Sequence, residues 1–351
     1  MGYHIVLRQN QDLENLRQEV QAKARPMPEF FLLQDKLDAH IHQPNVDATY
    51  RDNLTAIFEG NPSSWSLARK LAKELTQDDV VFCASEDMAI PLASMFLGKK
   101  NRPKIISLFY NVVRPRGLVS TKLFRIAQNI DLFLVITAYQ GEFLQKYLNI
   151  PEERVQFLWH KVDLDFFTPG PMSKAKTSPL LASAGLETRD YRLVAAATQA
   201  MDVDVRICAA SEHAKRLKRS FPAKIPENML HQYYSMKDLI QLYRDADIVI
   251  VSTFESNQSA GSTSLIEAMA CKRPVIVTKN KGIVNYLDPN AMHIVELGDV
   301  EGMKSAINDF LDHPDKATEY AERAYEIAKE RHTVKDFVKT VSKQMLRLSH
   351  A

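Results

Sequence analysis

Two glutamates frame the segment of this chain whose side chains are best suited to chemistry. Glu255 and Glu267 stand at the two ends of ESNQSAGSTSLIE, and the residues between them are mostly Ser, Gly, Ala, Thr, Asn and Gln. The run ADIVIVST before this stretch predicts a buried strand, and STSLIEAMA predicts a helix that begins near Ser262. The polar stretch therefore brings the N-terminus of a helix to the carboxyl end of a strand.

This arrangement suits a phosphorylated ligand. A helix N-terminus offers unpaired N–H groups and a partial positive charge. Gly261 lets ligand oxygens approach the backbone, and Ser262 or Thr263 can cap the helix or donate to an oxygen. Glu267 lies one to two turns into the helix and can accept bonds from vicinal hydroxyls, such as a ribose diol. These features describe a nucleoside-diphosphate site, and the alternative is a capped helix with a surface glutamate.

The same segment resembles the donor-site signature of the retaining GT-B glycosyltransferases, in particular glycosyltransferase family 4 (glycosyl transferases group 1). That signature reads S-x-x-E, a glycine-rich turn and then L-x-E-A-M-A-x-G-x-P-V-I; this chain has STFE at 252–255 and then LIEAMACKRPVIVT. LLASAGLETRDYRLV and YYSMKDLIQLYRDADIVIVST extend the resemblance over most of the second half, whereas the first half matches mainly in layout. The resemblance implies a retaining hexosyltransferase that uses a nucleoside-diphosphate sugar, with a UDP-sugar such as UDP-glucose favoured.

The resemblance also implies roles for individual residues. Glu267 would hold the ribose, Arg189 would bind the diphosphate, and the leaving phosphate would accept the proton of the attacking acceptor hydroxyl. The candidates for catalysis are Arg189, Glu255 and Asn111. The candidates for donor binding are Gly185, Tyr233, Tyr234, Ser259, Gly261, Ser262, Thr263, Ser264 and Glu267.

Three departures from the family pattern affect these roles. Eleven residues separate the two glutamates here, where the family has seven, so either Glu255 or Ser259 fills the first-glutamate position. Lys272 stands where the family usually has Gly, and the turn after the first strand of the second half keeps one obvious cation, Arg189. The glycine-rich loop after the first strand of the family is absent from HIVLRQNQDLEN, so we expect an acceptor site of different shape.

Polar residues also follow two predicted strands of the first half, in CASEDMAIPLA and FYNVVRPRG. The carboxyl ends of parallel strands meet at one edge of a sheet, where ligands bind. The acceptor-side candidates are therefore Glu86, Asp87, Tyr110 and Arg114. Helix capping by the acidic residues and a solvated turn are the alternatives.

Metal binding has little support in the sequence. D-x-D triplets occur at 163–165, 202–204 and 245–247, in three unrelated contexts, and His40 and His42 have no further ligands nearby in sequence. We expect no metal and no cofactor, with the nucleotide sugar as a substrate.

The alternation of apolar runs with helical patterns predicts an α/β protein. Continuous apolar strands between helices are typical of parallel sheets covered on both faces. With the resemblance, we predict GT-B architecture: two doubly wound, Rossmann-like domains facing across a cleft. Residues 1–168 would form the acceptor-binding domain and 169–332 the nucleotide-sugar-binding domain, and a helix over about 333–351 would pack back on the first.

The composition is that of an ordinary globular protein. The chain has 351 residues and a net charge of +2, so there is no global basic field for nucleic acid. The three cysteines are far apart, which fits thiols in a reducing compartment, and no apolar run reaches the length of a membrane span. We therefore expect a cytoplasmic protein.

Membrane association is a further expectation. The basic sequences GKKNRPK and RPRGLVSTKLFR lie in the first half, and the second contains Leu118, Val119, Leu123 and Phe124. This mixture suits an interfacial helix on an anionic membrane, and a solvated helix face is the alternative. The acceptor would be the hydroxyl of a lipid or a small molecule. A sugar-nucleotide epimerase of the same layout and a non-catalytic nucleotide-sugar-binding protein remain open as other functions.

Overall fold

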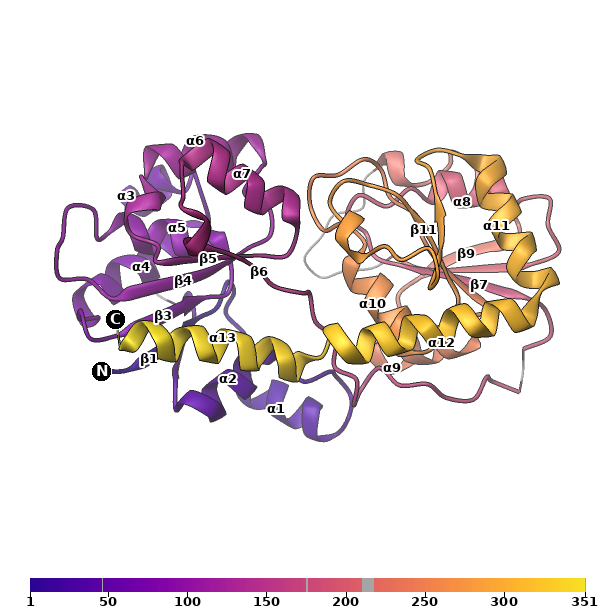
Figure 1. The fold of residues 1–351 in the computed structure, drawn as a ribbon, viewed down its shortest axis with the longest axis horizontal. Coiled ribbons are helices and arrows are strands. Elements are labelled where there is room, and N and C mark those ends of the chain that lie inside the picture. Colours follow the sequence, from indigo (N-terminus) through magenta and orange to yellow (C-terminus); the bar gives the residue numbers. More distant parts are fainter. Residues whose placement is uncertain (46, 175, 210–217, 351) are drawn as a thin grey trace. The chain divides into compact units, whose positions relative to one another are not determined.

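The structure is a computed structural model that describes residues 1–45, 47–174, 176–209 and 218–350. Within these ranges the chain forms two units, each built around one sheet (Figure 1). The N-terminal unit comprises residues 1–18, 27–159 and 335–350, and the C-terminal unit comprises residues 19–26 and 160–334. No helix in the described ranges is long and apolar enough to cross a membrane.

The N-terminal unit contains a parallel sheet of six strands in the order β2-β1-β3-β4-β5-β6. The strands are β1 (Tyr3–Val6), β2 (His40–His42), β3 (Val80–Cys83), β4 (Lys104–Phe109), β5 (Leu132–Val135) and β6 (Val155–Phe157). The helices are α1 (Leu13–Gln21), α2 (Glu29–Leu37), α3 (Tyr50–Thr55), α4 (Pro62–Glu74), α5 (Glu86–Ser94), α6 (Pro115–Leu123), α7 (Ala138–Leu148) and α13 (Val334–Ser349), with short 3₁₀ turns η1 (Ile126–Gln128) and η2 (Glu152–Arg154).

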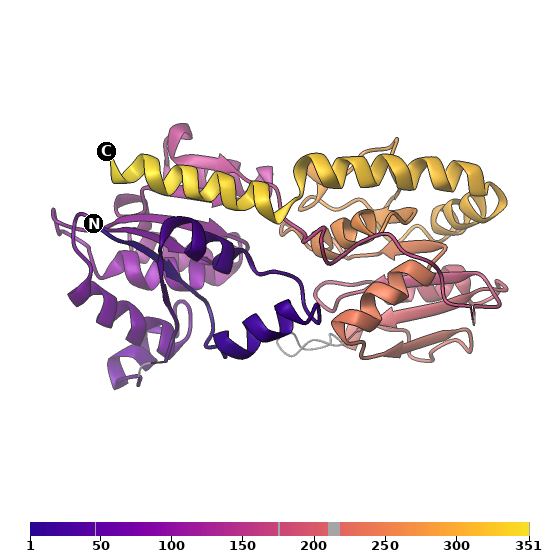
Figure 2. The same cartoon turned by 90° about the horizontal axis from the view of Figure 1, so that it is seen from below.

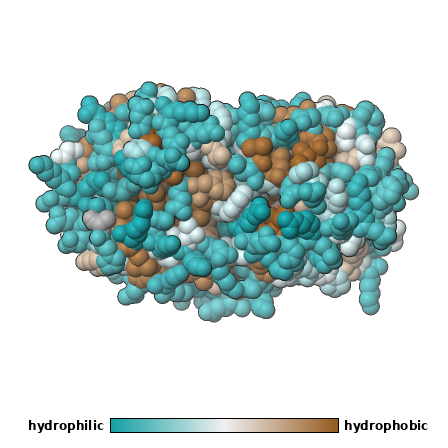
Figure 3. Space-filling model, viewed as in Figure 1, coloured by the Kyte–Doolittle hydropathy of each residue, from teal (hydrophilic) through white to brown (hydrophobic). Residues whose placement is uncertain are grey.

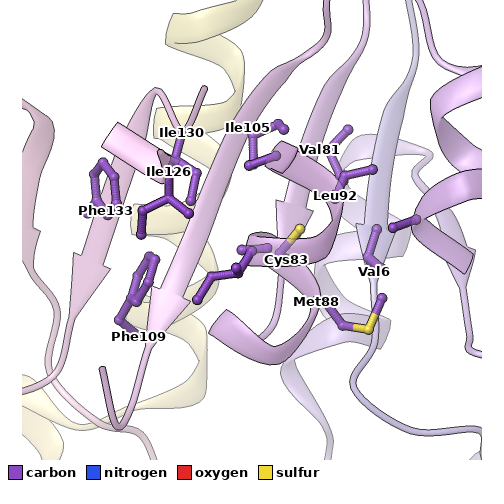
Figure 4. Close-up of a cluster of buried hydrophobic side chains, with 14 of the residues drawn as sticks. Val6, Val81, Cys83, Met88, Leu92, Ile105, Phe109, Ile126, Ile130 and Phe133 are labelled. Carbon is purple, nitrogen blue, oxygen red and sulfur yellow. The ribbon is translucent and has the colours of Figure 1, made fainter. Parts of the chain in front are cut away.

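Both faces of this sheet are buried because successive side chains of a strand point to opposite faces. In β3, Val81 and Cys83 join one apolar cluster with β4, β5 and α5, which Figure 4 shows. Val80 and Phe82 join a second cluster on the other face, which includes Val341 and Met345 of α13. Figures 1 and 2 both show α13 lying along the N-terminal unit. Helix α13 therefore contributes apolar side chains to the core of this unit.

The C-terminal unit contains a second parallel sheet of six strands, in the order β12-β11-β10-β7-β8-β9. The strands are β7 (Leu180–Ala184), β8 (Asp204–Cys208), β9 (Met229–Gln232), β10 (Ile248–Val251), β11 (Val275–Thr278) and β12 (His293–Val295). The helices are α8 (Tyr191–Thr198), α9 (Met236–Asp245), α10 (Ser262–Ala270), α11 (Val300–Asp312) and α12 (Pro314–Arg331), with 3₁₀ turns η3 (Lys218–Ser220) and η4 (Val284–Tyr286).

The two central strands of this sheet, β7 and β10, are adjacent and parallel. Their carboxyl ends therefore lie at the same edge, next to the start of α10. Apolar side chains from the sheet pack with α8 and α11 in one cluster. Most of the molecular surface seen in Figure 3 is hydrophilic, with separate hydrophobic patches. The predicted α/β class with two parallel, doubly wound sheets is confirmed.

Candidate functional site

The N-terminus of α10 lies at the carboxyl edge of the C-terminal sheet and has no side-chain cap. Its N-cap residue is Gly261, whose φ of 98° is in the left-handed region. Of the two roles expected for Ser262 and Thr263, capping is therefore not observed, and donation to a ligand oxygen stays a prediction. A Cβ atom at Gly261 would lie 2.8 Å from Val251 Cγ1, which leaves no room for another residue. The Ser262 N–H donates to Ser259 O at 3.0 Å and the Leu265 N–H donates to Gly261 O at 2.9 Å. The N–H groups of Thr263 and Ser264 lie between them, at positions where a helix offers no carbonyl partner of its own.

Arg189 is buried beneath this helix end, with 5% of its surface exposed. Its Nε donates to Ala184 O at 2.8 Å and one terminal nitrogen, Nη2, donates to Ser264 Oγ at 2.6 Å. The other terminal nitrogen, Nη1, is buried and has no hydrogen-bond partner among the described residues. Two nitrogens of Arg189 are therefore held by hydrogen bonds, and its third nitrogen, Nη1, is unpaired.

Two glycines make space for this guanidinium. A Cβ at Gly185 would lie 2.5 Å from Nη2 of Arg189, and a Cβ at Gly261 would lie 3.3 Å from Nη1. Gly185 also has a φ of 108°, which side chains rarely adopt. A buried cation next to the positive end of a helix is electrostatically unfavourable unless an anion binds there. The geometry therefore favours an anion at the start of α10.

Glu267 is half-buried on α10, close enough to Arg189 for the two charges to interact. Burial raises the pKa of Glu267 to about 7, although the hydrogen bond from Tyr243 and the charge of Arg189 oppose this rise. The Tyr243 hydroxyl donates to Glu267 Oε2 at 2.9 Å, and burial together with the nearby Glu267 raises the pKa of Tyr243 well above its ordinary value. This carboxyl group therefore changes charge near neutral pH.

The loop before α10 is held by a residue that the sequence did not single out, Asn280, which follows β11. Asn280 is 2% exposed; its Nδ2 donates to Thr253 Oγ1 at 2.7 Å and to Ala260 O at 3.4 Å, and its Oδ1 accepts from Gly282 N at 2.9 Å. A Cβ at Gly282 would lie 1.5 Å from Gln258 O, so the two loops pack backbone to backbone. The rule that ligand sites follow strand ends, applied to β11, would have pointed to this pair.

The remaining donor candidates lie in more open positions. Glu255 and Thr263 are exposed, and Ser259 is half-buried. Tyr233 is 67% exposed and Tyr234 is half-buried, and burial raises the pKa of Tyr234. Both tyrosines follow β9, which β8 separates from β7, so the structure does not place them beside α10. Which of Glu255 and Ser259 takes the first-glutamate role stays open.

The acceptor-side candidates meet at the carboxyl edge of the N-terminal sheet. The buried Glu86 accepts hydrogen bonds from the backbone N–H groups of Tyr110 at 3.0 Å and Asn111 at 2.8 Å. Burial and the charge of Asp87 raise the pKa of Glu86. Because Glu86 begins α5 and Asn111 follows β4, this carboxyl group joins two strand ends.

Arg114 connects this edge to an acid that the sequence gave no reason to select. It bonds to Asp87 Oδ1 at 2.9 Å and to Glu59, which is fully buried and also accepts from Ser120 Oγ at 2.7 Å. Arg8, just past β1, pairs with the other Asp87 oxygen at 2.7 Å. The predicted candidates Glu86, Asp87, Asn111 and Arg114 therefore form one hydrogen-bonded group.

Three of the residues considered for metal binding, Asp245, Asp247 and His42, have other contacts. Asp245 accepts from Ser173 N at 2.6 Å, and Asp247 pairs with Lys176 at 2.5 Å, ahead of β10 and thus away from its carboxyl end. His42 Nε2 lies 2.9 Å from His4 Nδ1, and burial lowers the pKa of His42 to about 4.

Lys272 explains one departure from the family pattern. Its φ is 55°, in the left-handed region that favours glycine, just after α10 ends. Its ammonium group pairs with Glu322 of α12 at 2.7 Å. A glycine would adopt this backbone geometry readily, and the lysine adopts it with an added ion pair.

Comparison with known proteins connects this geometry to a family. Residues 189–342 match the family model described as glycosyl transferase-like. The match covers less than half of the chain and supports the predicted likeness to the group 1 glycosyltransferases. A D-inositol 3-phosphate glycosyltransferase from Mycobacterium sp. (strain JLS) is 25% identical over 181 residues, covering 45% of this chain and 39% of that protein. The chain thus spans less than half the length of this curated glycosyltransferase.

Solved structures resemble the chain over its full length. Sucrose-phosphate synthase from Thermosynechococcus elongatus has a TM-score of 0.72 at 13% identity, covering 99% of both chains. HepE from Anabaena, in complex with UDP-glucose, has a TM-score of 0.71 at 12% identity and covers 99% of this chain and 100% of that one. At such identities the likeness shows the fold alone, and it confirms the predicted GT-B glycosyltransferase fold.

Replacing Asn280 by alanine should loosen the loop that positions α10. Asn280→Ala removes three hydrogen bonds in a buried site, and we expect a loss of about 1–3 kcal/mol in the free energy of unfolding by urea. Asn290→Ala, at an exposed asparagine of the same unit, should change it by less than about 0.5 kcal/mol. Equal effects of the two substitutions would contradict the role of Asn280.

Proposed function

We propose that this protein is a glycosyltransferase that moves a hexose from a nucleoside-diphosphate sugar to a hydroxyl acceptor. The observation that carries the proposal is the buried Arg189 at the uncapped N-terminus of α10, with an unpaired Nη1 atom. An anion bound there would accept from Nη1 and from backbone N–H groups of the helix, and a diphosphate has the charge and the oxygen atoms to do both.

The donor in this proposal is a UDP-hexose. The HepE structure of the same fold contains UDP-glucose, which makes this nucleotide sugar the first to test. Glu267 would accept bonds from the ribose hydroxyls with the oxygen atoms that Tyr243 leaves available. Tyr233 and Tyr234 would border the base.

The proposed reaction proceeds with retention of configuration and without a metal. The acceptor oxygen bonds to the anomeric carbon on the face from which the diphosphate leaves, the bond from that carbon to the phosphate oxygen breaks, and this oxygen takes the acceptor proton. Arg189 and the start of α10 stabilise the negative charge that develops on the leaving group. Full activity in the presence of EDTA and an α-linked product from UDP-glucose are expected.

Two other functions give different products. An epimerase would convert UDP-glucose with no acceptor present, and a non-catalytic binding protein would leave it intact with every acceptor. The family match does not favour either of them. Product analysis of enzyme and UDP-glucose, with and without acceptor, separates all three, because a transferase releases UDP in proportion to glycosylated acceptor.

The N-terminal unit also carries a surface suited to a membrane. Val119 and Leu123 of α6 are 56% and 51% exposed, and Ile57, which follows α3, is 66% exposed. The Arg116 guanidinium bonds to Ala56 O and thereby joins α6 to this turn. The exposed cations nearby include Arg116, Lys122 and Arg125. We propose that this apolar and basic surface docks the protein on anionic lipid from the cytoplasmic side, where a lipid acceptor would be found.

Removing the charge of Arg189 should weaken nucleotide binding. Arg189→Met is expected to lower the affinity for UDP by roughly 10- to 100-fold, because a charge-assisted bond contributes about 1.5–3 kcal/mol. The affinity is measured by calorimetry on the folded variant. Arg192→Met, at a half-exposed neighbour, serves as the control and should bind UDP normally. A folded Arg189→Met variant with unchanged UDP affinity would rule out the diphosphate contact.

The affinity for UDP-glucose should rise with pH around neutrality. The pKa of Glu267 is about 7, so the carboxylate that accepts from the ribose forms as the pH rises from 6 to 8. If binding needs this ionised form, affinity increases about tenfold over that range. The diphosphate of UDP-glucose stays ionised throughout, and Glu267→Gln should abolish the slope. A pH-independent wild type would refute the ribose role.

Membrane docking is tested by sedimentation with lipid vesicles. The protein should pellet with vesicles that contain an anionic lipid and stay in solution with zwitterionic ones. Ile57→Asp should prevent pelleting, whereas Leu230→Asp, at a site that is 46% exposed on the C-terminal unit, should not. Equal pelleting of the two variants would show that the α3–α6 surface is not the contact.

A further inference from the structure

The charged side chains at the carboxyl edge of the N-terminal sheet are already paired with one another. Three acids, Glu59, Glu86 and Asp87, lie with two bases, Arg8 and Arg114. Arg8 pairs with Asp87, and Arg114 pairs with both Asp87 and Glu59. The group has a formal excess of one negative charge, and a proton on Glu86, favoured by its burial, makes it neutral. Neither state leaves positive charge for a phosphate.

Polar atoms of the same edge lack partners. Ser85 Oγ, Asn111 Oδ1, Gln140 Oε1 and Arg114 Nε are buried and make no hydrogen bond within the described residues. Ser85 and Gln140 are 4% and 0% exposed, so bulk water does not satisfy them. Buried polar atoms normally have a hydrogen-bond partner, and a ligand group that completes these bonds gains affinity.

The unpaired atoms surround one turn. The carboxyl group of Glu86, next to Ser85, binds the backbone of Tyr110 and Asn111, and the Gln140 amide donates to the carbonyl oxygen of Tyr110. Ser85, Asn111 and Gln140 follow β3, β4 and β5, so all three lie past strand ends at the same edge of the sheet.

The chemistry of these atoms selects the ligand. Asn111 Oδ1 and Gln140 Oε1 are acceptors and need a donor, while Arg114 Nε is a donor and needs an acceptor. A hydroxyl group supplies both functions. An ionised phosphate supplies acceptors only, so it leaves the two amide oxygens unpaired and adds charge beside three acids.

We propose that this edge binds an uncharged, hydroxyl-rich group of the acceptor, a sugar or polyol, and discriminates against a phosphorylated one. The inference rests on the proposed function, because it names the acceptor class of the same enzyme. The hydroxyl groups belong either to a free sugar or to the headgroup of a glycolipid, and the choice of probes separates these sources.

The experiment measures ligand binding to the full chain saturated with UDP by saturation-transfer NMR. The probes are glucose, octyl glucoside as a glycolipid headgroup, glucose 6-phosphate, myo-inositol and myo-inositol 1-phosphate. We expect glucose and myo-inositol each to bind at least tenfold more tightly than glucose 6-phosphate and myo-inositol 1-phosphate, respectively. Tighter binding of octyl glucoside than of glucose identifies the lipid source, and equal binding identifies the free sugar.

Variants locate the effect. Asn111→Ala should weaken binding of the uncharged probes at least fivefold and leave UDP affinity unchanged. Asn101→Ala, at an exposed asparagine before the same strand β4, is the matched control and should bind like the wild type. Asp87→Asn frees charge on Arg8 and Arg114 and should reduce the discrimination against glucose 6-phosphate at least threefold.

Two results would overturn this inference. One is tighter binding of the phosphorylated probes, and the other is no binding of any uncharged probe to a chain that binds UDP. In both cases the proposed donor site would be unaffected, and only the proposed acceptor class would be wrong. Failure to bind UDP would instead remove the proposed function, so the two failures are distinguishable.

Discussion

The guanidinium of Arg189, buried under the first turn of α10, is the constraint on which the C-terminal unit is organised. Burying a positive charge beside the positive end of a helix raises the free energy of the folded protein, and the surrounding residues hold this charge in one position. A carbonyl oxygen and a serine hydroxyl hold two of its nitrogens, and Gly185 and Gly261 leave space around them. The third nitrogen has no partner in the described residues. Such an arrangement becomes favourable when an anion binds, as the diphosphate of the proposed donor would.

The loops around α10 follow from this requirement. Gly261 ends the polar loop in a left-handed conformation, and the helix begins there without a side-chain cap. Asn280 and Gly282 fix the loop from the neighbouring strand β11. Glu267 lies on the same helix with a pKa near 7, because burial opposes its ionisation more than Arg189 and Tyr243 favour it. A fixed cation from the turn after β7 and a carboxyl group of adjustable charge on α10 therefore lie near each other, which suits the diphosphate and the diol of the proposed donor.

The sequence predicted the fold class and the helix that begins near Ser262 after a buried strand for specific physical reasons. Apolar runs without polar interruptions specify strands buried on both faces, and the polar stretch before LIEAMA identifies a helix start at a strand end. Capping could not be predicted, since serines and a glycine compete for the N-cap and packing against Val251 decides in favour of Gly261. Glu59 and Gln140 gave no signal, because their roles depend on contacts with Arg114 and Tyr110 that are distant in sequence. Lys272 departs from the family pattern in residue type, but its positive φ is one that the expected glycine would adopt readily.

Nitrogen-15 NMR of the Arg189 side chain tests the central claim most directly. In the free protein its Nε–H and Nη–H₂ groups should give signals typical of a fixed guanidinium with one unpaired Nη. Saturating UDP should shift the Nη1 signal and slow the rotation of that group, and uridine, which lacks the diphosphate, should do neither. Identical Arg189 signals in the free protein and in a chain saturated with UDP would contradict the account.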